Sequence, residues 1–265
     1  MILVLLGCAE ELNDCEGWDA PEVVGTVESE LVDELSGIAL SAAQPDWMWV
    51  HNDSGDTSRV FAMGTDGSDG GRWVLAGIEL EDAEDIALAD GQLILGDIGD
   101  NKRKREAVFL HVFDEPEVTA GGGTLTEIET RTLRYPNGAE DAEALVVDED
   151  GTIWLFTKGA SSIVYRVEGE ELVEVGEIDP RRWRLDDRTQ VTGADLIEGK
   201  LVVRMYDHIL VWNVDSAGVG STVDGTACSI PVAYEPQGEA LGGGPGGFYT
   251  ASEGEGAALH RYARR

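Results

Sequence analysis

The feature that most constrains this chain is a pair of short apolar strands that recurs five times. In each copy the second strand follows the first by about ten residues and runs into a polar or glycine-containing turn. We take Ile38, Ile86, Leu145, Leu196 and Leu241 as the equivalent positions of the five copies. The resulting period of roughly 45–60 residues is typical of propeller blades and related arrays. The copies read SGIALS…DWMWVHNDSG, EDIALA…QLILGDIGDN, EALVVD…TIWLFTKG, ADLIEG…LVVRMYD and EALGGG…GFYTASEG.

Within a copy, the apolar stretches predict four antiparallel strands. The second copy divides into strands at 85–88, 92–95, 108–113 and about 130–135. The third copy repeats the pattern at 144–147, 152–157, 162–167 and about 172–177. A pair of β-sandwiches is the competing interpretation. A period near 50 residues instead favours four-stranded sheets arranged radially, which is an all-β propeller.

The two ends of the chain predict how the ring closes. The fifth copy supplies strands at 240–241, 248–251 and 259–262, and it lacks a fourth. Residues 23–27 form an apolar strand that belongs to no copy. Pairing it with 259–262 would complete the last blade and remove two exposed sheet edges. We therefore expect a single five-bladed domain over 23–265. Six blades are the alternative, with an extra hairpin hidden between 86 and 145.

The N-terminus carries a candidate targeting signal. Residues 1–8 are apolar and end in Leu-Leu-Gly-Cys, which resembles the lipobox of bacterial lipoproteins. The resemblance implies cleavage before Cys8 and lipidation of that residue, with 1–7 as the remnant of a signal peptide and 8–22 as an acidic tether. There is no basic region before the apolar run, and that run is short for a signal peptide. The expected location is the bacterial cell envelope, at its periplasmic or outer-membrane face.

Export gives a role to the other two cysteines. With Cys8 acylated, Cys15 and Cys228 form an even pair in an oxidising compartment. A disulfide between them would pin the N-terminal arm beside the closing blade; two free thiols are the alternative. No Cys-x-x-Cys or Cys/His spacing indicates zinc or redox chemistry.

The charge restricts the partners. The chain has 52 acidic and 19 basic residues, a net charge of −33. Repulsion disfavours nucleic acid and anionic lipid surfaces as ligands, so we expect membrane contact only through the lipid anchor. A small molecule or an envelope protein remains as a partner for what we expect to be a monomer. The seven tryptophans, several of them within strands, are expected to pack between blades.

The repeat also predicts where function lies. The start of each first strand and the end of each second strand meet at one mouth of a propeller channel. The first group comprises Ser36, Gly37, Glu84, Asp85, Glu143, Asp195 and Glu239. The second group comprises His51, Asn52, Asp53, Asp97, Asp100, Asn101, Thr157, Lys158, Arg204, Asp207, Ser252 and Glu253.

Carboxylates from at least four copies in these groups cannot all remain ionised without a counter-charge. A hard divalent cation such as Ca²⁺, ion pairs with Lys158 and Arg204, or shared protons would each resolve the repulsion. The candidate metal ligands are Glu84, Glu143, Asp195 and Glu239. The candidate ligand-binding residues are Asn52, Asp97, Asp100, Asn101, Asp207 and Glu253.

The blocks HNDSGD, EDIAL…GDIGDN, DAEAL and TGAD carry a family resemblance over most of residues 34–254. They resemble, loosely, the secreted propellers of the gluconolactonase-like and esterase-like-phytase families. Gluconolactonase-like enzymes hold one divalent cation with a Glu, Asn residues and an Asp. The resemblance implies that Glu84, Glu143 or Glu239 stands for that Glu, Asn52 or Asn101 for an Asn, and Asp195 for the Asp. This chain has more Glu and fewer channel Asn than that pattern.

Two functions from different classes follow. The first is a lipid-anchored binding or scaffold propeller whose acidic channel face holds a cation or a small ligand. The second is a metal-dependent hydrolase of a lactone or phosphoester. In a hydrolase, His51 or Asp53 would be the general base, and Lys158 or Arg204 would hold an oxyanion or a phosphate. No Gly-x-Ser-x-Gly or H-E-x-x-H motif is present, and the GGGPGG run lacks the Lys and Ser/Thr of a nucleotide-binding loop.

Overall fold

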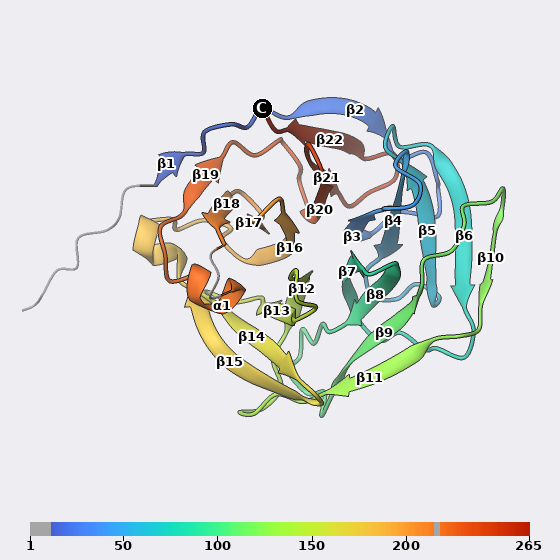
Figure 1. The fold of residues 1–265 in the computed structure, drawn as a ribbon, viewed down its shortest axis with the longest axis horizontal. Helices are drawn as coiled ribbons and strands as arrows, with labels where there is room; N and C mark the ends of the chain where they lie inside the picture. Colours follow the sequence, from blue (N-terminus) through green and yellow to red (C-terminus); the bar gives the residue numbers. More distant parts are fainter. Residues whose placement is uncertain (1–11, 215–217) are drawn as a thin grey trace, which may run out of the picture.

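Five β-sheets stand around a central axis like the blades of a propeller (Figure 1). The structure is a computed structural model that describes residues 12–214 and 218–265. Within that part of the chain the sheets number five, so the five-bladed ring is confirmed. The six-bladed and double-sandwich alternatives are wrong. No helix in these two ranges is long and apolar enough to cross a membrane.

The innermost strand of each blade lies at the axis, and the chain runs outward from it. Blade one comprises β3 (Leu35–Leu40), β4 (Trp47–Asn52), β5 (Arg59–Gly64) and β6 (Asp69–Leu75). Blade two comprises β7 (Ala83–Ala89), β8 (Gln92–Asp97), β9 (Val108–Asp114) and β11 (Glu129–Leu133). Blade three comprises β12 (Ala142–Val147), β13 (Ile153–Thr157), β14 (Ser162–Glu168) and β15 (Glu171–Ile178).

The last two blades follow the same order. Blade four comprises β16 (Val191–Ile197), β17 (Lys200–Met205), β18 (Ile209–Asn213) and β19 (Cys228–Ile230). Blade five comprises β20 (Gly238–Gly244), β21 (Gly247–Ser252), β22 (Ala258–Ala263) and β2 (Glu22–Thr26). Short helices at Pro180–Trp183 (η1) and Val219–Thr222 (α1) lie in the connections.

The ring closes as the sequence predicts. β2 pairs antiparallel with β22, so the first strand of the ring completes its last blade. This pairing replaces two free sheet edges with backbone hydrogen bonds. It joins the two ends of the ring without any further element.

Two blades carry an additional outer strand in parallel pairing. β10 (Gly122–Leu125) pairs with β6 of blade one, although in sequence it lies in the connection between β9 and β11 of blade two. The long second copy therefore contains a strand that crosses to its neighbour, not a hidden hairpin. β1 (Asn13–Asp14) pairs in the same way with β19 of blade four.

The core lies in apolar layers between successive blades. Trp49 packs edge-to-face on Trp73 with ring centroids 4.9 Å apart, and Trp183 packs on Trp212 at 5.9 Å. All four of these tryptophans are buried. Trp49 and Trp73 belong to a buried cluster that joins blades one and two, and Trp183 and Trp212 belong to one that joins blades three and four. Because a buried indole contributes a large apolar area, these tryptophans stabilise the contacts between blades. The packing role expected for them is confirmed.

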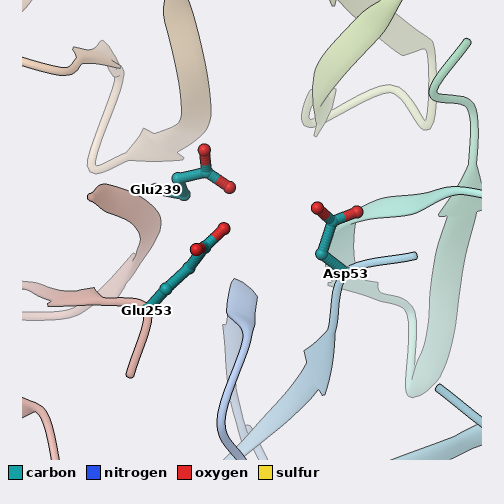
Figure 2. Close-up of side chains that lie close together, drawn as sticks. All are labelled: Asp53, Glu239 and Glu253. Atoms are coloured by element: carbon teal, nitrogen blue, oxygen red, sulfur yellow. The ribbon is translucent and has the colours of Figure 1, made fainter. Parts of the chain in front are cut away.

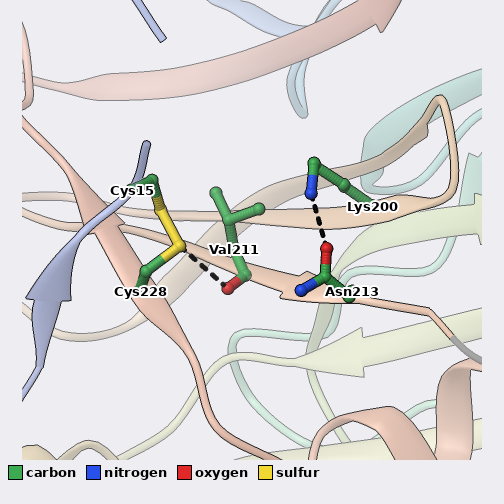
Figure 3. Close-up of a disulfide and its surroundings, with 5 residues drawn as sticks. All are labelled: Cys15, Lys200, Val211, Asn213 and Cys228. Atoms are coloured by element: carbon green, nitrogen blue, oxygen red, sulfur yellow. Dashed lines mark hydrogen bonds between the residues drawn. A yellow bond between two sulfur atoms is a disulfide. The ribbon is translucent and has the colours of Figure 1, made fainter. Parts of the chain in front are cut away.

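The N-terminal arm is fixed to blades four and five. Cys15 and Cys228 form the expected disulfide, with their Cα atoms 5.0 Å apart and a separation of 213 positions in sequence (Figure 3). Trp18 is buried against Phe248, with ring centroids 5.1 Å apart. The described part of the expected tether, residues 12–22, thus lies against the propeller. Cys8 and the expected signal peptide lie outside the described residues.

A β-bulge at the same place in every innermost strand positions the candidate site. In each blade the pairing with the second strand shifts by one residue near the strand's start. A bulge re-aims the extra residue and increases the local twist. The bulged residues are Ser36, Glu84, Glu143, Thr192 and Glu239.

The bulges also correct the alignment of the repeats in blade four. Ile38, Ile86, Leu145 and Leu241 do occupy one equivalent position, opposite the second strand. In blade four that position is Ala194, which pairs with Val203, and not Leu196. The innermost strand of blade four begins at Val191, earlier than its apolar pattern indicates. The apolar pattern misses this start because Thr192 and Gly193, which belong to the strand, are not apolar side chains. Asp195 therefore lies three residues beyond the bulge.

Candidate metal centre at the channel mouth

Three kinds of position in the blades supply charged side chains to the channel mouth. The first is the bulged residue, which is Glu84, Glu143 or Glu239 in three of the blades. The second lies two residues earlier and is Asp82 in blade two and Asp141 in blade three. The third directly follows the second strand and is Asp53, Lys158 or Glu253 in blades one, three and five. Carboxylates from four blades thereby converge on one mouth.

The carboxylates form three overlapping triads. In each triad, one oxygen from each residue lies within 4.8 Å of the others. Asp53 belongs to two triads and Glu84 to two, so the three triads contain seven residues. Figure 2 shows the carboxylates of Asp53, Glu239 and Glu253 pointing toward one another. The triads are Asp53–Glu239–Glu253, Asp53–Asp82–Glu84 and Glu84–Asp141–Glu143.

One cation contacts this cluster. Lys158 Nζ lies 2.7 Å from Glu143 Oε2 and 4.0 Å from Glu239 Oε1. In the described part of the chain, these are the only ion pairs that the seven carboxylates form within 4.0 Å. Tyr206 adds a neutral partner, since its hydroxyl donates to Glu239 Oε1 at 2.8 Å. Within the described residues, Lys158 is thus the one cation in ion-pair contact with the seven acidic groups.

Glu143 leaves part of its carboxylate unpaired. Its side chain is 2 % exposed, and its Oε1 is buried without a hydrogen-bond partner. A buried, unpaired acceptor is costly, so nearly all such oxygens in folded proteins have a partner. The neighbouring Glu84 is held close to the 99 loop: a Cβ added to Gly99 would lie 2.1 Å from Glu84 Oε1. Any residue other than glycine at position 99 would therefore collide with Glu84 Oε1.

The cluster raises the pKa values of its own members. Burial raises the pKa of Glu143 to about 8, although Lys158 opposes the shift. Burial and then the charge of Glu143 raise the pKa of Glu84 well above its usual range. Burial raises the pKa of Asp53 to about 6 and, together with Glu239, that of Glu253 to about 8. At neutral pH the cluster without a cation therefore holds protons in place of a counter-charge.

These residues match the coordination chemistry of a hard cation. The donors are all carboxylate oxygens, three buried residues form the innermost triad, and one of them presents an unpaired oxygen. Ca²⁺ takes six to eight oxygen ligands, and Mg²⁺ and Mn²⁺ also prefer carboxylates. A divalent ion among Glu84, Asp141 and Glu143 would occupy the unpaired oxygen and offset the repulsion that burial amplifies.

The predicted site residues divide into two sets. The structure brings together Glu84, Glu143, Glu239, Asp53, Lys158 and Glu253 at the mouth. Asp195 lies elsewhere, because both of its carboxylate oxygens accept backbone N–H groups, from Leu196 at 2.7 Å and Gly243 at 2.7 Å. Asp195 thereby links blade four to blade five. The expectation that Asp195 lies beside the other metal candidates is wrong, because Asp195 stands three residues beyond the bulge of its strand.

His51 and Arg204 are both buried below the mouth. His51 is 0 % exposed, its Nδ1 lies 2.8 Å from the Asn52 carbonyl, and burial lowers its pKa to about 4. Arg204 is also 0 % exposed; it pairs with Glu235 and donates to the Gly238 carbonyl at 2.9 Å. Neither side chain faces the carboxylate cluster. Of the four catalytic candidates, Asp53 belongs to the carboxylate cluster and Lys158 contacts it.

The remaining ligand-binding candidates hold loops in place. Asn52 donates to the Leu31 carbonyl at 2.8 Å. Asp97 accepts from the Asp82 backbone at 3.0 Å and pairs with Arg105 at 2.8 Å. Asp100 accepts the Arg105 N–H at 2.7 Å, and Asp207 pairs with Arg188 at 3.1 Å. Asn101 is exposed in the same loop as Asp100.

Three residues of the site were not predicted. Asp82 and Asp141 each stand two positions before a bulged Glu, in the repeated tetrapeptide EDAE at 81–84 and 140–143. That repeat is a signal that could have identified both. Tyr206 has no such signal, because its position follows from the register of β17.

Comparison with known proteins supports the fold. No protein-family model and no curated protein matches the chain. The PQQ-bound aldose sugar dehydrogenase of Streptomyces coelicolor has a TM-score of 0.56 at 9 % identity, covering 95 % of this chain and 100 % of its own. The glutaminyl cyclase of Myxococcus xanthus has a TM-score of 0.56 at 12 % identity, covering 97 % and 100 %. A candidate gluconolactonase has a TM-score of 0.53 at 12 % identity, covering 96 % and 94 %. At these identities the likeness establishes a propeller fold and nothing about activity.

Proposed function

We propose that the channel mouth binds a divalent cation, with Ca²⁺ as the first candidate, and that the protein acts as an exported, lipid-anchored binding or scaffold propeller. The observation that carries the proposal is the buried Glu143, whose Oε1 lacks a partner inside a triad of buried carboxylates. A lone acidic cluster can be stabilised by protons. A buried carboxylate oxygen with no donor is better explained by a cation.

The ion-pair explanation alone accounts for only part of the cluster. Lys158 neutralises one carboxylate, and its second contact, with Glu239, is at the 4.0 Å limit. Asp53, Asp82 and Glu84 form a triad that Lys158 does not contact. A divalent ion would bring two further positive charges to the side of the cluster where Asp141 and Glu84 lie.

The disulfide supports the export that we propose. Disulfides persist in oxidising compartments and are rare in the cytosol of most organisms. The Cys15–Cys228 bond begins seven residues after Cys8 in sequence, so a lipid on Cys8 would hold the propeller close to a membrane surface. The partner at the mouth would then be a small molecule or an envelope protein that meets the cation.

A metal-dependent hydrolase is a second candidate, and Asp53 is the observation that favours it. Asp53 lies at the mouth with its pKa raised by burial to about 6, so it is mainly ionised at pH 7 and can accept a proton from water. The Lys158 ammonium could hold a developing oxyanion of a lactone or phosphoester. A panel of lactones and phosphoesters, assayed with and without Ca²⁺, separates turnover from binding.

Thermal unfolding tests the cation site. At a Ca²⁺ concentration 100 times its Kd, binding should stabilise the protein by about 2.7 kcal/mol, or roughly 5–10 °C in midpoint, relative to EDTA. Glu143→Gln, Glu84→Gln and Glu239→Gln should each reduce that shift. Glu129→Gln is the matched control, because Glu129 is exposed on β11 and the substitution removes the same charge. An equal shift in midpoint with Ca²⁺ in Glu143→Gln and in Glu129→Gln would contradict the proposal.

A further inference from the structure

A groove lies on the mouth face between blades four and five. Its cavity volume is about 520 Å³, large enough for a small organic ligand. It adjoins the carboxylate cluster, because Tyr206 lines the groove and donates its hydroxyl to Glu239 at 2.8 Å. Its lining includes Arg188, Tyr206, Asp207 and Tyr234.

Tyr234 is presented to solvent on a fixed backbone. Its side chain is 91 % exposed, the largest value among the exposed large hydrophobic residues of the described chain. The residue before it, Ala233, donates its N–H to Tyr262 Oη at 2.8 Å. The residue after it, Glu235, is buried and accepts from Thr250 at 2.8 Å. An aromatic ring held in water on an anchored backbone is suited to stacking against a ligand.

A second wall of the groove presents a donor beside an acceptor. The Arg188 guanidinium lies 4.7 Å from the centroid of the Tyr206 ring and pairs with Asp207 at 3.1 Å. It also donates to the Pro236 carbonyl at 2.8 Å. Arg188 has a left-handed backbone, with φ at 44°, which costs free energy for a residue with a side chain. Both members of the pair are 48 % exposed, so each can still bond to a ligand.

We propose that this groove binds a polyhydroxylated ring, of the pyranose type, as the body of the ligand whose other end reaches the cation site. Hydroxyl groups accept from Arg188 and donate to Asp207 at once, and the apolar face of such a ring stacks on Tyr234. An anion would be repelled by Asp207 and the carboxylate cluster. A plain aromatic ligand would leave the Arg188–Asp207 pair unused. The inference deepens the proposed function by naming its ligand class.

Saturation-transfer NMR on the full chain tests the inference. The probes are methyl β-D-glucopyranoside, methyl β-D-galactopyranoside and methyl β-D-xylopyranoside, with benzoate and methyl phosphate as the competing ligand classes. We expect transfer to ring protons of at least one pyranoside, reduced at least threefold in Tyr234→Ala. Tyr234 makes few contacts with the rest of the protein, so the variant should fold. Val74→Ala is the control, because Val74 is also an exposed apolar residue, at 43 % exposure, on β6 of blade one.

Two outcomes would overturn the inference. One is transfer to the pyranosides that is absent or unaffected by Tyr234→Ala, and the other is stronger Tyr234-dependent transfer to benzoate or methyl phosphate. Repeating the measurement in EDTA separates this inference from the cation site. If pyranosides still bind in EDTA and Ca²⁺ does not stabilise the protein, the proposed cation site is contradicted and the groove is not. Stabilisation by Ca²⁺ without pyranoside binding contradicts the groove alone.

Discussion

At the scale of the residue, the site depends on where a few carboxylates are forced to lie. Glu84 and Glu143 occupy bulges of innermost strands, so their side chains meet at the axis although 59 positions separate them in sequence. Burial then raises the pKa of each, because a carboxylate loses the solvation of water. The same placement that makes the cluster unfavourable without a counter-ion makes it a strong site for one.

This arrangement predicts a pH dependence with a definite sign. The pKa of Glu143 is raised to about 8 and that of Asp53 to about 6, so the folded chain binds protons that the unfolded chain releases above about pH 4.5. Without a cation, the free energy of unfolding should therefore fall as the pH rises from about 5 to about 8. The affinity for Ca²⁺ should rise over the same window, because the ion replaces those protons.

Denaturant unfolding in EDTA and Ca²⁺ titrations, both at pH 5, 6, 7 and 8, check this expectation. Glu143→Gln should flatten both dependences, whereas Glu129→Gln should leave them as in the wild type. A stability that rises with pH across this window in EDTA would contradict the assignment.

At the scale of the element, the register of the innermost strand decides which residue enters the site. The sequence alone predicted the number of blades, the closing strand and the mouth positions of blades two, three and five. The prediction failed in blade four. Thr192 and Gly193 are small residues that do not indicate the start of a strand, and the apolar pair Leu196–Ile197 indicated a strand that starts later. The bulge residues themselves are not visible in an apolar pattern, because a bulge changes pairing and not composition.

Asp195 shows what that register means for function. Its two oxygens accept N–H groups from its own strand and from β20, so it joins two blades. Asp195→Asn places an amide donor against a backbone donor and should lower the free energy of unfolding by about 1–3 kcal/mol. The affinity for Ca²⁺ should stay within twofold of the wild type. Loss of Ca²⁺ binding in a folded Asp195→Asn variant would show that this residue does belong to the cation site.

At the scale of the whole molecule, the ring is closed twice. β2 completes blade five, and the Cys15–Cys228 bond ties the N-terminal arm to blade four. The pairing of two cysteines so far apart was predictable from their number and the expected export. That the arm also packs through Trp18 was not predictable, since Trp18 stands alone in a polar segment.

The double closure predicts that the disulfide is important for stability and unimportant for the site. Cys15→Ser with Cys228→Ser should lower the free energy of unfolding by about 2–4 kcal/mol, because the unfolded chain gains freedom. Guanidinium unfolding of the double variant measures that loss. The shift in midpoint caused by Ca²⁺ should be the same as in the wild type, because the bond lies on the outer strand of blade four. A loss of the Ca²⁺ effect together with the disulfide would contradict this separation.

The central claim is that a divalent cation lies among Glu84, Asp141 and Glu143. The most direct measurement is anomalous diffraction from crystals of the full chain equilibrated with Mn²⁺, compared with crystals treated with EDTA. We predict an anomalous peak at the channel mouth within coordination distance, about 2.0–2.6 Å, of carboxylate oxygens that include Glu143 Oε1. Crystals treated with Mn²⁺ that show no peak at this position, with Lys158 as the only partner of Glu143, would contradict the claim.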